Sequence, residues 1–340
     1  MEKISIAIVG ATGLVGRKVL EVLDEENIKI GKLILLASKK SANKTMIFKG
    51  KEYKVLELTE HSFDEKIDYA IFSAGSDVAK KYAPIAAKNG TIVIDNSNAF
   101  RMEKDVPLII PEVNKEKIKE NKGIIANPNC STIQAVVAIK PLYDKYRIKR
   151  IVYSTYQAVS GAGKKGLEDL NNGILKYANK DNPKFNYKLQ KFDYEIFNNC
   201  LPQIDIFMEN GYTREEMKMI NETRKILDDK NLKITATCVR VPVFNSHSES
   251  INIEFKDNID MNEIFKALKK QQNLKIVNSK KYLYPINSIA NEKNDVLVGR
   301  IRRDESVKNG INIWVVADNI RKGAATNAVQ ILEELIKNKN

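Results

Sequence analysis

Residues 4–16, ISIAIVGATGLVG, place a glycine-rich turn between a buried strand and a helix. The first six residues form an almost continuous apolar run, which is typical of a strand buried on both faces in a parallel sheet. After the G-x-x-G-x-x-G turn, apolar residues recur at helical spacing at positions 14, 15, 19, 20 and 23. Glycines in such a turn let the backbone approach a pyrophosphate at the helix N-terminus. The chain is therefore expected to begin with a dinucleotide-binding unit.

The alternation of strand and helix patterns continues over the first 130 residues. Further strand patterns lie at 33–37, 69–73, 91–94, 108–110 and 123–126, with a helix pattern at 77–88. This order predicts a doubly wound, Rossmann-like parallel sheet. Later strand patterns, at 150–157, 234–241, 250–255 and 312–317, alternate more and favour a mixed, largely antiparallel sheet, with helices at 213–228 and 261–269. The predicted fold class is α/β followed by an α+β domain.

A chain of 340 residues exceeds the size at which a single core stops growing. We expect a nucleotide-binding domain at 1–129, a second domain at 130–318 and a terminal segment at 319–340. Its helix, at 323–337, has one apolar face that can pack back on the first domain. The polar stretch 171–199 is expected to be a long surface excursion.

Composition narrows the class of protein. The formal net charge is +13, but the lysines are scattered and not interleaved with aromatic residues, so a lysine-rich surface is favoured over a nucleic-acid site. The apolar runs are strand-sized, and the first residues enter a strand at once, so neither a membrane span nor a signal peptide is expected. Three cysteines without metal-type spacing argue against a metal site and favour the cytoplasm.

The end of the second strand distinguishes between the two nicotinamide cofactors. A fold selective for NAD usually has an acid here that binds the ribose hydroxyls. Residues 37–41 read ASKKS instead, with hydroxyls and cations. We therefore predict NADP, with Ser38 and Lys39 as the best candidates to bind its 2′-phosphate. Lys40 cannot be separated from Lys39 by this argument, and both lysines could equally be solvated loop charges.

Residues 127–134, NPNCSTIQ, place the thiol of Cys130 between a short apolar run and an amphipathic one. This pattern predicts a strand, a tight turn and a helix N-terminus. The unpaired N–H groups and positive dipole end of a helix stabilise a thiolate, so Cys130 is the candidate nucleophile. Taken by itself, the pattern suits equally well a buried cysteine that acts as a small apolar side chain.

Only two histidines occur, and their settings differ. His61 lies in a polar loop and is interpreted as a surface residue. His247 lies between small hydroxyl residues, where one strand ends and the next begins. Because imidazole titrates near neutral pH, His247 is the candidate acid/base, with a structural histidine as the alternative.

Three further polar side chains lie at or after the ends of predicted strands. Arg240 has apolar neighbours and is expected to pair with a carboxylate of the protein or of a ligand, because its planar fork binds carboxylates bidentately. Arg101 is placed to meet an anion near the cofactor crevice. Gln157 and the glycine loop at 160–163 are expected to orient the substrate near the nicotinamide.

Seven motifs spread over nearly the whole chain resemble those of the aspartate-β-semialdehyde dehydrogenases. They are GATGLVG at 10–16, SAGS at 73–76, NPNCSTIQ at 127–134, STYQAVSGAG at 154–163, EEMK at 215–218, RVPVFNSHSES at 240–250 and VGRIR at 298–302. The resemblance implies that Cys130 forms an acyl thioester, that His247 is the acid/base, that Gln157 positions the acyl group and that Asn129 supports the thiol.

The same resemblance implies the residues that bind the substrate and the cofactor. Arg240 would bind the substrate carboxylate, Glu215 would lie near its amino group, and Arg101 and Lys218 would bind phosphate. The implied NADP contacts are Gly10, Thr12, Gly13, Leu14, Val15, Ser38, Lys39, Ser41, Ala74, Gly75, Ser160, Gly161 and Asn319. A homodimer built largely through the second domain, which is then the catalytic and dimerisation domain, is also implied.

The implied reaction is the reversible, NADPH-dependent conversion of L-aspartyl-4-phosphate into L-aspartate-4-semialdehyde and phosphate. It would serve lysine (through diaminopimelate), methionine and threonine biosynthesis. The nearest alternative is an N-acetyl-γ-glutamyl-phosphate reductase, and glyceraldehyde-3-phosphate dehydrogenase is weaker because the acid expected for NAD is missing. A non-catalytic NADP-binding regulator is favoured only by the positive charge.

Overall fold

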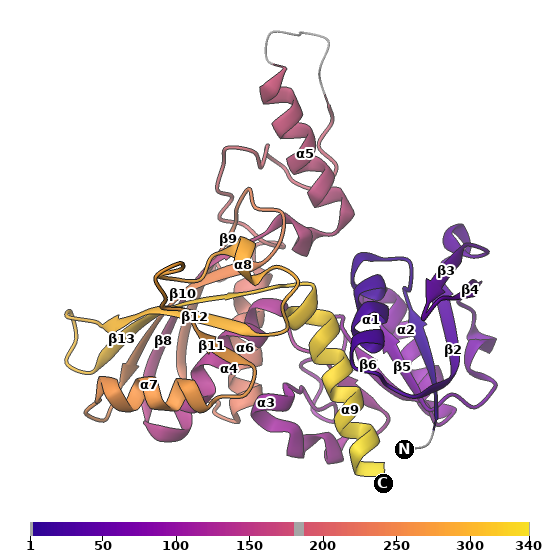
Figure 1. Ribbon diagram of the computed structural model, residues 1–340, viewed down its shortest axis with the longest axis horizontal. Coiled ribbons are helices and arrows are strands. Elements are labelled where there is room, and N and C mark those ends of the chain that lie inside the picture. Colours follow the sequence, from indigo (N-terminus) through magenta and orange to yellow (C-terminus); the bar gives the residue numbers. More distant parts are fainter. Residues whose placement is uncertain (1–2, 180–186, 340) are drawn as a thin grey trace. The chain divides into compact units, whose positions relative to one another are not determined.

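The computed structural model describes residues 3–179 and 187–339, which form two compact units (Figure 1). Unit 1 is drawn from Met1–Asn129, Lys225–Asp228 and Gly323–Asn340, and unit 2 from Cys130–Arg224 and Asp229–Lys322. In this described part of the chain, no helix is long and apolar enough to cross a membrane.

Unit 1 is built on a seven-stranded sheet with the order β3-β4-β2-β1-β5-β6-β7. Its strands are β1 Ile4–Val9, β2 Ile30–Ala37, β3 Thr45–Phe48, β4 Lys51–Glu57, β5 Tyr69–Phe72, β6 Ile92–Asp95 and β7 Ile124–Ala126. All neighbours run parallel except β3 and β4, which form an antiparallel hairpin at one edge. The helices are α1 Leu14–Glu25, α2 Ser76–Lys88, α3 Pro111–Asn114 and α9 Asn327–Lys339.

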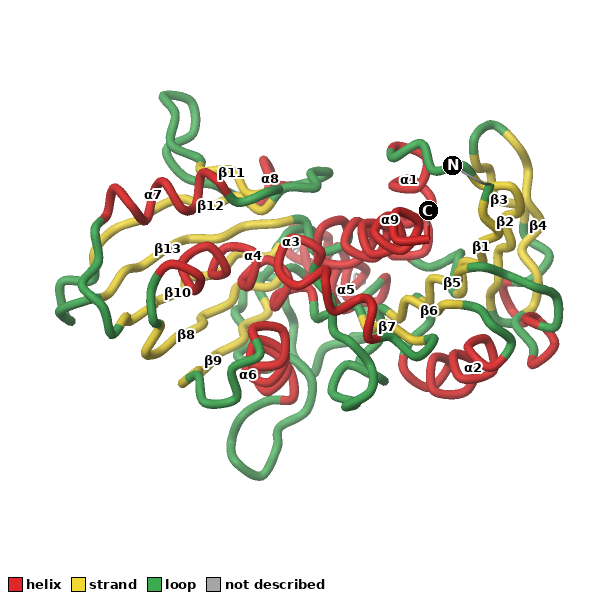
Figure 2. Tube along the Cα trace, turned by 90° about the horizontal axis from the view of Figure 1, so that it is seen from below, coloured by secondary structure: helices red, strands yellow, loops and turns green. Residues whose placement is uncertain are grey.

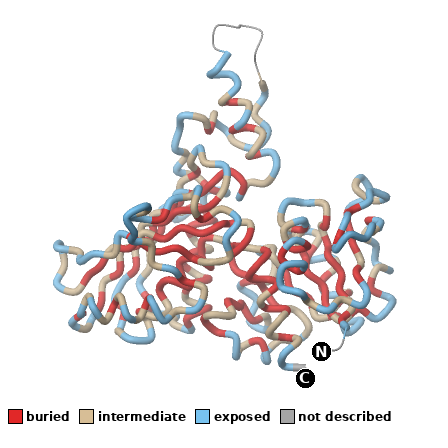
Figure 3. The backbone as a smooth tube through the Cα atoms, in the orientation of Figure 1, coloured by how far each residue is buried: buried red, intermediate tan, exposed pale blue. Residues whose placement is uncertain are grey.

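The two faces of this sheet pack against different helices. Because successive strand residues point to opposite faces, Ile6 and Ile8 of β1 share a core with Leu20 of α1 and Leu332 of α9. Val9 points the other way, into a core that also holds alanines of α2. The first strand is therefore buried on both faces, as its apolar run predicts, and Figure 3 shows the burial of these strands.

Unit 2 is built on a six-stranded mixed sheet with the order β11-β12-β13-β10-β8-β9. Its strands are β8 Ile148–Gln157, β9 Lys233–Arg240, β10 His247–Phe255, β11 Leu274–Ile276, β12 Val296–Arg303 and β13 Gly310–Ala317. The four strands β12, β13, β10 and β8 pair antiparallel, while β9 and β11 add in parallel at the two edges. Figure 2 shows these strands in yellow. The predicted fold class is confirmed.

The helices of unit 2 are α4 Cys130–Lys145, α5 Lys164–Ala178, α6 Arg214–Leu227, α7 Met261–Lys270 and α8 Asn287–Ala290. Helix α4 packs against β8, β10, β12 and β13, so its first residue, Cys130, starts on one face of the sheet. That face carries every second residue of each strand. The side chains on that face of the sheet determine the surroundings of the Cys130 thiol.

Two predictions from the sequence were wrong in part. Residues 108–110 form no strand, because Leu108 makes a single bridge to Ala126 and a short helix begins at Pro111. The first part of the polar stretch at 171–199 is helical, since α5 runs to Ala178. Its apolar residues, among them Leu170 and Ile174, pack into a small separate core. Positions 180–186 of that stretch lie outside the described residues.

Candidate active site

Cys130 begins α4, directly after the turn that follows β7. Its surroundings differ from those of the two other cysteines, because Cys130 is partly exposed whereas Cys238 is buried and Cys200 is exposed. All three are thiols rather than disulfides. A partly exposed thiol at the positive end of a sixteen-residue helix is in a suitable place for a nucleophile.

Three polar side chains stand at the same end of three neighbouring strands. Gln157 ends β8, Arg240 ends β9 opposite it in register, and His247 begins β10. They are buried, with exposed fractions of 1%, 5% and 0%. Buried polar groups need partners. The partners that each one finds within unit 2 define what it can offer a ligand.

The peptide group of Ala158 holds both His247 and Arg240. Its N–H donates a hydrogen bond to His247 Nδ1 (3.0 Å), and its carbonyl oxygen accepts one from Arg240 Nη1 (2.6 Å). Gly161 lies against the same two side chains. A Cβ at this position would come within 3.0 Å of Arg240 Nη1 and 3.2 Å of His247 Nε2. A larger residue here would therefore push Arg240 or His247 aside by a few tenths of an ångström.

The His247 ring is neutral near pH 7. Burial and, to a lesser extent, the positive charge of Arg240 lower the pKa of His247 to about 3, against smaller opposing effects of Glu215 and of a hydrogen bond with the Ser246 backbone. Its Nε2 atom is buried and makes no hydrogen bond within residues 3–179 and 187–339. This nitrogen is therefore the atom that His247 can offer to a ligand.

Arg240 is a buried cation that lies within electrostatic range of the thiol. Burial lowers the pKa of Arg240, while the negative forms of Glu215 and Cys130 raise it. A guanidinium stays charged in proteins, so Arg240 favours the thiolate form of Cys130. Within the described residues, its side chain makes the bond to Ala158 and no ion pair, which leaves part of its fork for a ligand carboxylate.

A chain of polar contacts connects Gln157 to a lysine. Gln157 Nε2 donates to Glu215 Oε1 (3.1 Å), and Lys218 Nζ donates to Glu215 Oε2 and to Asp205 Oδ2 (3.0 Å each). Burial alone would lower the pKa of Lys218, but Glu215 and Asp205 outweigh it, and the pKa is raised. Lys218 therefore carries a positive charge near the strand ends.

Two predicted cofactor contacts of unit 2 support the strand turn before His247. Asn319 Nδ2 donates to Ser160 Oγ (3.0 Å), and Asn319 Oδ1 accepts from the N–H of Ser246 (2.9 Å). Ser246 has a φ of 70°, a left-handed conformation that costs free energy in a non-glycine residue. Asn287, which sequence reasoning missed, donates to the carbonyl of Ser246 (2.6 Å) and accepts from Ser248 Oγ (3.0 Å).

The predicted nucleotide-binding residues of unit 1 gather at the carboxyl ends of its strands. Gly10 begins the turn after β1 with a φ of 82°, and a Cβ there would come within 2.7 Å of the Ser73 carbonyl oxygen. Ser38 and Lys39 follow β2 and are exposed. Ser41 ends the short 3₁₀ helix that follows β2. The other members lie in the turn and first residues of α1 and in the turn before α2: Thr12, Gly13, Leu14, Val15, Ala74 and Gly75.

Arg101 and Asn129 also belong to unit 1. Both are buried, and the Arg101 guanidinium donates to the carbonyl oxygens of Asn127 and Asn96 (2.9 Å each). The amide of Asn127 in turn donates to Asn96 Oδ1 (2.8 Å). Arg101 is therefore a rigidly held cation at the carboxyl ends of β6 and β7.

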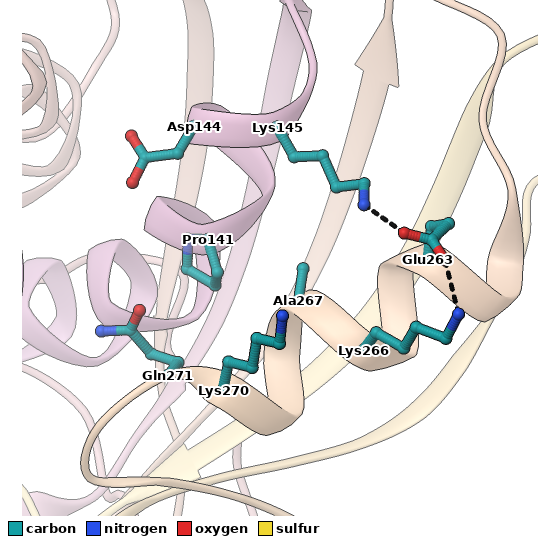
Figure 4. A pocket seen from close by; sticks show the side chains of 8 residues that line it. All are labelled: Pro141, Asp144, Lys145, Glu263, Lys266, Ala267, Lys270 and Gln271. Carbon is teal, nitrogen blue, oxygen red and sulfur yellow. Dashed lines mark hydrogen bonds and ion pairs between the residues drawn. The ribbon is translucent and has the colours of Figure 1, made fainter.

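A surface hollow of about 300 Å³ in unit 2 is separate from these residues (Figure 4). It lies between the end of α4 and α7, where Lys145 and Lys266 both pair with Glu263. None of the predicted site residues lines it. In the described part of the chain, no group of three or more histidine, cysteine or acidic side chains could hold a metal ion.

Two features together define a dinucleotide-linked dehydrogenase. One is a parallel sheet with a glycine turn after its first strand, and the other is a unit in which a helix-start thiol lies within electrostatic range of a buried arginine that shares a peptide group with a buried histidine. Comparison with known proteins gives the same class. Residues 5–121 match the family model "Semialdehyde dehydrogenase, NAD binding domain", and residues 139–322 match "Semialdehyde dehydrogenase, dimerisation domain".

Relatives that match over the full length of the chain identify its family within the semialdehyde dehydrogenases. The chain is 54% identical to the aspartate-semialdehyde dehydrogenase of Aquifex aeolicus, over 98% of both chains, and 49% identical to that of Campylobacter jejuni, over 100% of this chain and 99% of the other. It is also similar to the crystal structure of aspartate semialdehyde dehydrogenase II of Vibrio cholerae complexed with ASA, with 46% identity, a TM-score of 0.95 and 99% of both chains covered. The chain therefore belongs to the aspartate-semialdehyde dehydrogenase family.

Proposed function

We propose that this chain catalyses the reversible, NADPH-dependent reductive dephosphorylation of L-aspartyl-4-phosphate to L-aspartate-4-semialdehyde. Membership of the family supports the proposal, as does the relative from Vibrio cholerae that was crystallised with ASA. The observation that carries it is the buried Arg240, which lies within electrostatic range of the Cys130 thiol and has no ion pair within the described residues. A substrate with a carboxylate would form the ion pair with Arg240, and its acyl group would be attacked by the Cys130 thiol.

The charged side chains match the charged groups of the substrate. Arg240 binds the α-carboxylate through the part of its guanidinium that does not contact Ala158. Glu215 lies near the amino group of the substrate. Hydrogen bonds from Gln157 and Lys218 hold its carboxylate in place. Lys218 binds phosphate by exchanging its contact with Asp205 for one with a phosphate oxygen, and Arg101 is the second phosphate ligand.

The reaction proceeds through the thiol. The Cys130 thiolate attacks the acyl carbon, the bond from carbon to phosphate oxygen breaks, and an acyl thioester forms. Gln157 orients the acyl group, and Asn129 supports the thiol from the adjoining turn. His247 is the acid/base that handles the proton as the aldehyde departs. When the thiohemiacetal collapses, the carbon–sulfur bond breaks, the aldehyde leaves and Cys130 is again a thiolate.

The residues of unit 1 fit NADP. NADPH, when bound, supplies the hydride that reduces the thioester carbon. The turn at Gly10 has no room for a Cβ, and the side chains of Ser38, Lys39 and Ser41 make no hydrogen bond or ion pair within the described residues. Hydroxyls and a cation in this position suit a 2′-phosphate. From unit 2, Ser160, Gly161 and Asn319 complete the set of proposed contacts.

The proposal includes the division of labour between parts of the chain. Residues 1–129 bind NADP, residues 130–318 carry catalysis and dimerisation, and residues 319–340 add a helix to the first domain. The match to a dimerisation-domain model supports a homodimer. A cytoplasmic location suits an enzyme of amino-acid biosynthesis (lysine through diaminopimelate, methionine and threonine) that works through a reduced thiol.

The test is a spectrophotometric assay in the reverse direction. The protein is mixed with aspartate semialdehyde and NADP, and NADPH absorbance is followed with and without phosphate. Phosphate-dependent NADPH formation, lost in Cys130→Ser, is the expected result. If the folded protein is inactive with aspartate semialdehyde but active with N-acetylglutamate semialdehyde, the aspartyl substrate is wrong. Inactivity with both contradicts the enzymatic proposal.

A further inference from the structure

The last turn of α6 carries a lysine whose ammonium group contacts three backbone carbonyl oxygens. Lys225 is one of the residues of this helix that are part of unit 1. Its Nζ atom donates to the carbonyl oxygens of Arg101 (2.7 Å), Glu103 (2.7 Å) and Val106 (2.8 Å). An ammonium group has three N–H donors. The number of acceptors on this one loop, residues 101–106, therefore equals the number of donors.

The loop has an arrangement that its own side chains do not explain. Residues 102–105 are exposed, so apolar packing does not fix their backbone. Asp105 pairs with Lys122 (3.2 Å), but both side chains are about 70% exposed, and such a pair contributes little. Three carbonyl oxygens within 2.8 Å of one atom lie close together, and their negative ends repel one another. The positive charge of Lys225 removes this repulsion.

Arg101 is the residue of this loop to which we assign a role in binding. It begins the loop, is buried, and donates from its guanidinium to the carbonyl oxygens of Asn127 and Asn96. These contacts hold the far end of its side chain. The bond from Lys225 to its own carbonyl oxygen holds its backbone. The position of the guanidinium therefore depends on contacts at both ends of the residue.

We propose that Lys225 is a positioning residue whose ammonium group holds the 101–106 loop, so that the guanidinium of Arg101 stays in place to bind the phosphate of the substrate. The proposal rests on the function proposed above, because that function gives Arg101 its phosphate. The anchoring of the loop itself depends only on contacts within unit 1.

A second contact at the end of α6 provides a matched control. Lys117 Nζ lies 3.3 Å from Oδ2 of Asp228, the residue that follows the helix, and the Asp228 side chain is 79% exposed. Both residues belong to unit 1. Lys117→Met removes a lysine contact at the same end of α6 and leaves the contacts of Lys225 with the loop in place. It therefore separates holding the loop from holding the helix end.

The anchor can be tested without substrate or cofactor. Hydrogen–deuterium exchange is followed by mass spectrometry on peptides that cover the 101–106 loop, where the amides of Glu103 and Val106 are hydrogen-bonded (3.1 Å and 3.3 Å). Methionine keeps an unbranched side chain but has no N–H donor. We expect exchange in this loop to be about tenfold faster in Lys225→Met and unchanged in Lys117→Met. Equal rates in Lys225→Met and the wild type would overturn the proposal.

Steady-state kinetics tests the role in phosphate binding. Phosphate, NADP and aspartate semialdehyde are varied in turn. We expect Lys225→Met to raise the KM for phosphate about tenfold and the two other KM values less than about twofold, because a displaced guanidinium affects phosphate alone. An unchanged KM for phosphate, or an equal rise in all three, would overturn the proposal. Lys225→Gln, which keeps an amide donor, should show a smaller rise and serves if Lys225→Met does not fold.

A double variant shows whether Lys225 acts through Arg101. Arg101→Gln alone should raise the KM for phosphate about 10²-fold. Adding Lys225→Met should raise it no further, because the loop then has no guanidinium to position. Effects that multiply independently would overturn the proposal. An unchanged KM in Arg101→Gln would instead contradict the phosphate role of Arg101 in the proposed function, while the exchange rates would still decide whether Lys225 anchors the loop.

Discussion

Glu249 lies on β10 two residues after His247, on the same face of the sheet, and is fully buried. Neither of its carboxyl oxygens makes a hydrogen bond within the described residues. Its neighbours in register are Thr155 and Val315, which carry no charge. Burial alone raises the pKa of Glu249 well above its ordinary value of 4.5. The carboxyl group therefore keeps its proton in the folded protein at neutral pH.

Because Glu249 keeps its proton on folding, the unfolding free energy of the protein depends on pH. Above pH 4.5, Glu249 ionises in the unfolded chain but stays protonated in the folded one, so the folded state holds one proton more. The contribution of Glu249 is fully present below pH 4.5 and is lost as pH rises toward the folded pKa. Each pH unit in this window costs about 1.4 kcal/mol of unfolding free energy.

Glu249→Gln removes the ionisation while keeping the size and the neutral charge of the folded side chain. Relative to the wild type, this variant should gain unfolding free energy as pH rises above 4.5, by up to about 1.4 kcal/mol for each pH unit below the folded pKa. The assay is urea unfolding at several pH values and one protein concentration. Glu254→Gln, a partly exposed position on the same strand that pairs with Lys149, is the matched control and should not reproduce this slope. A difference between Glu249→Gln and wild type that stays constant with pH would refute the argument.

Three further predictions concern the site. Gly161→Ala should lower kcat about 10- to 100-fold without unfolding the protein, because its Cβ would displace Arg240 and His247, and steady-state kinetics with thermal melting checks this. Lys39→Ala should weaken NADP about tenfold in a fluorescence titration and leave NAD unchanged, whereas an equal loss for both would remove the 2′-phosphate role. Asp205→Asn should lower the KM for phosphate about two- to fivefold, because Lys218 loses a competing carboxylate; an unchanged KM would argue against Lys218 as the phosphate ligand.

Much of the fold could be predicted because its elements have strong local patterns. The strand of residues 4–9 is apolar throughout, and the glycine turn and helix follow without a gap. The hairpin of β3 and β4 was missed because it is short, rich in lysine and half exposed at a sheet edge. Helix α5 was not predicted, because Asn171, Asn172 and Gly173 in its middle are poor helix formers, although Gly173 fits closely against Phe197.

The candidate site could be predicted only where a side chain carries the chemistry. Gln157, Arg240 and His247 were visible because polar residues at strand ends interrupt apolar patterns. Ala158 acts through its backbone and leaves no signal in the sequence. Glu249 is part of a quoted motif, but nothing in that motif indicates that the carboxyl group is fully buried and makes no hydrogen bond within the described residues. Such facts depend on tertiary packing.

The central claim is that Cys130 carries the acyl group, and trapping the thioester tests it most directly. The protein is mixed with aspartate semialdehyde and NADP without phosphate, quenched in acid, digested and analysed by mass spectrometry. The account predicts an aspartyl group on the peptide that contains Cys130, which disappears when phosphate is added before the quench. Formation of NADPH with an unmodified Cys130, or acylation of Cys200 alone, would contradict it.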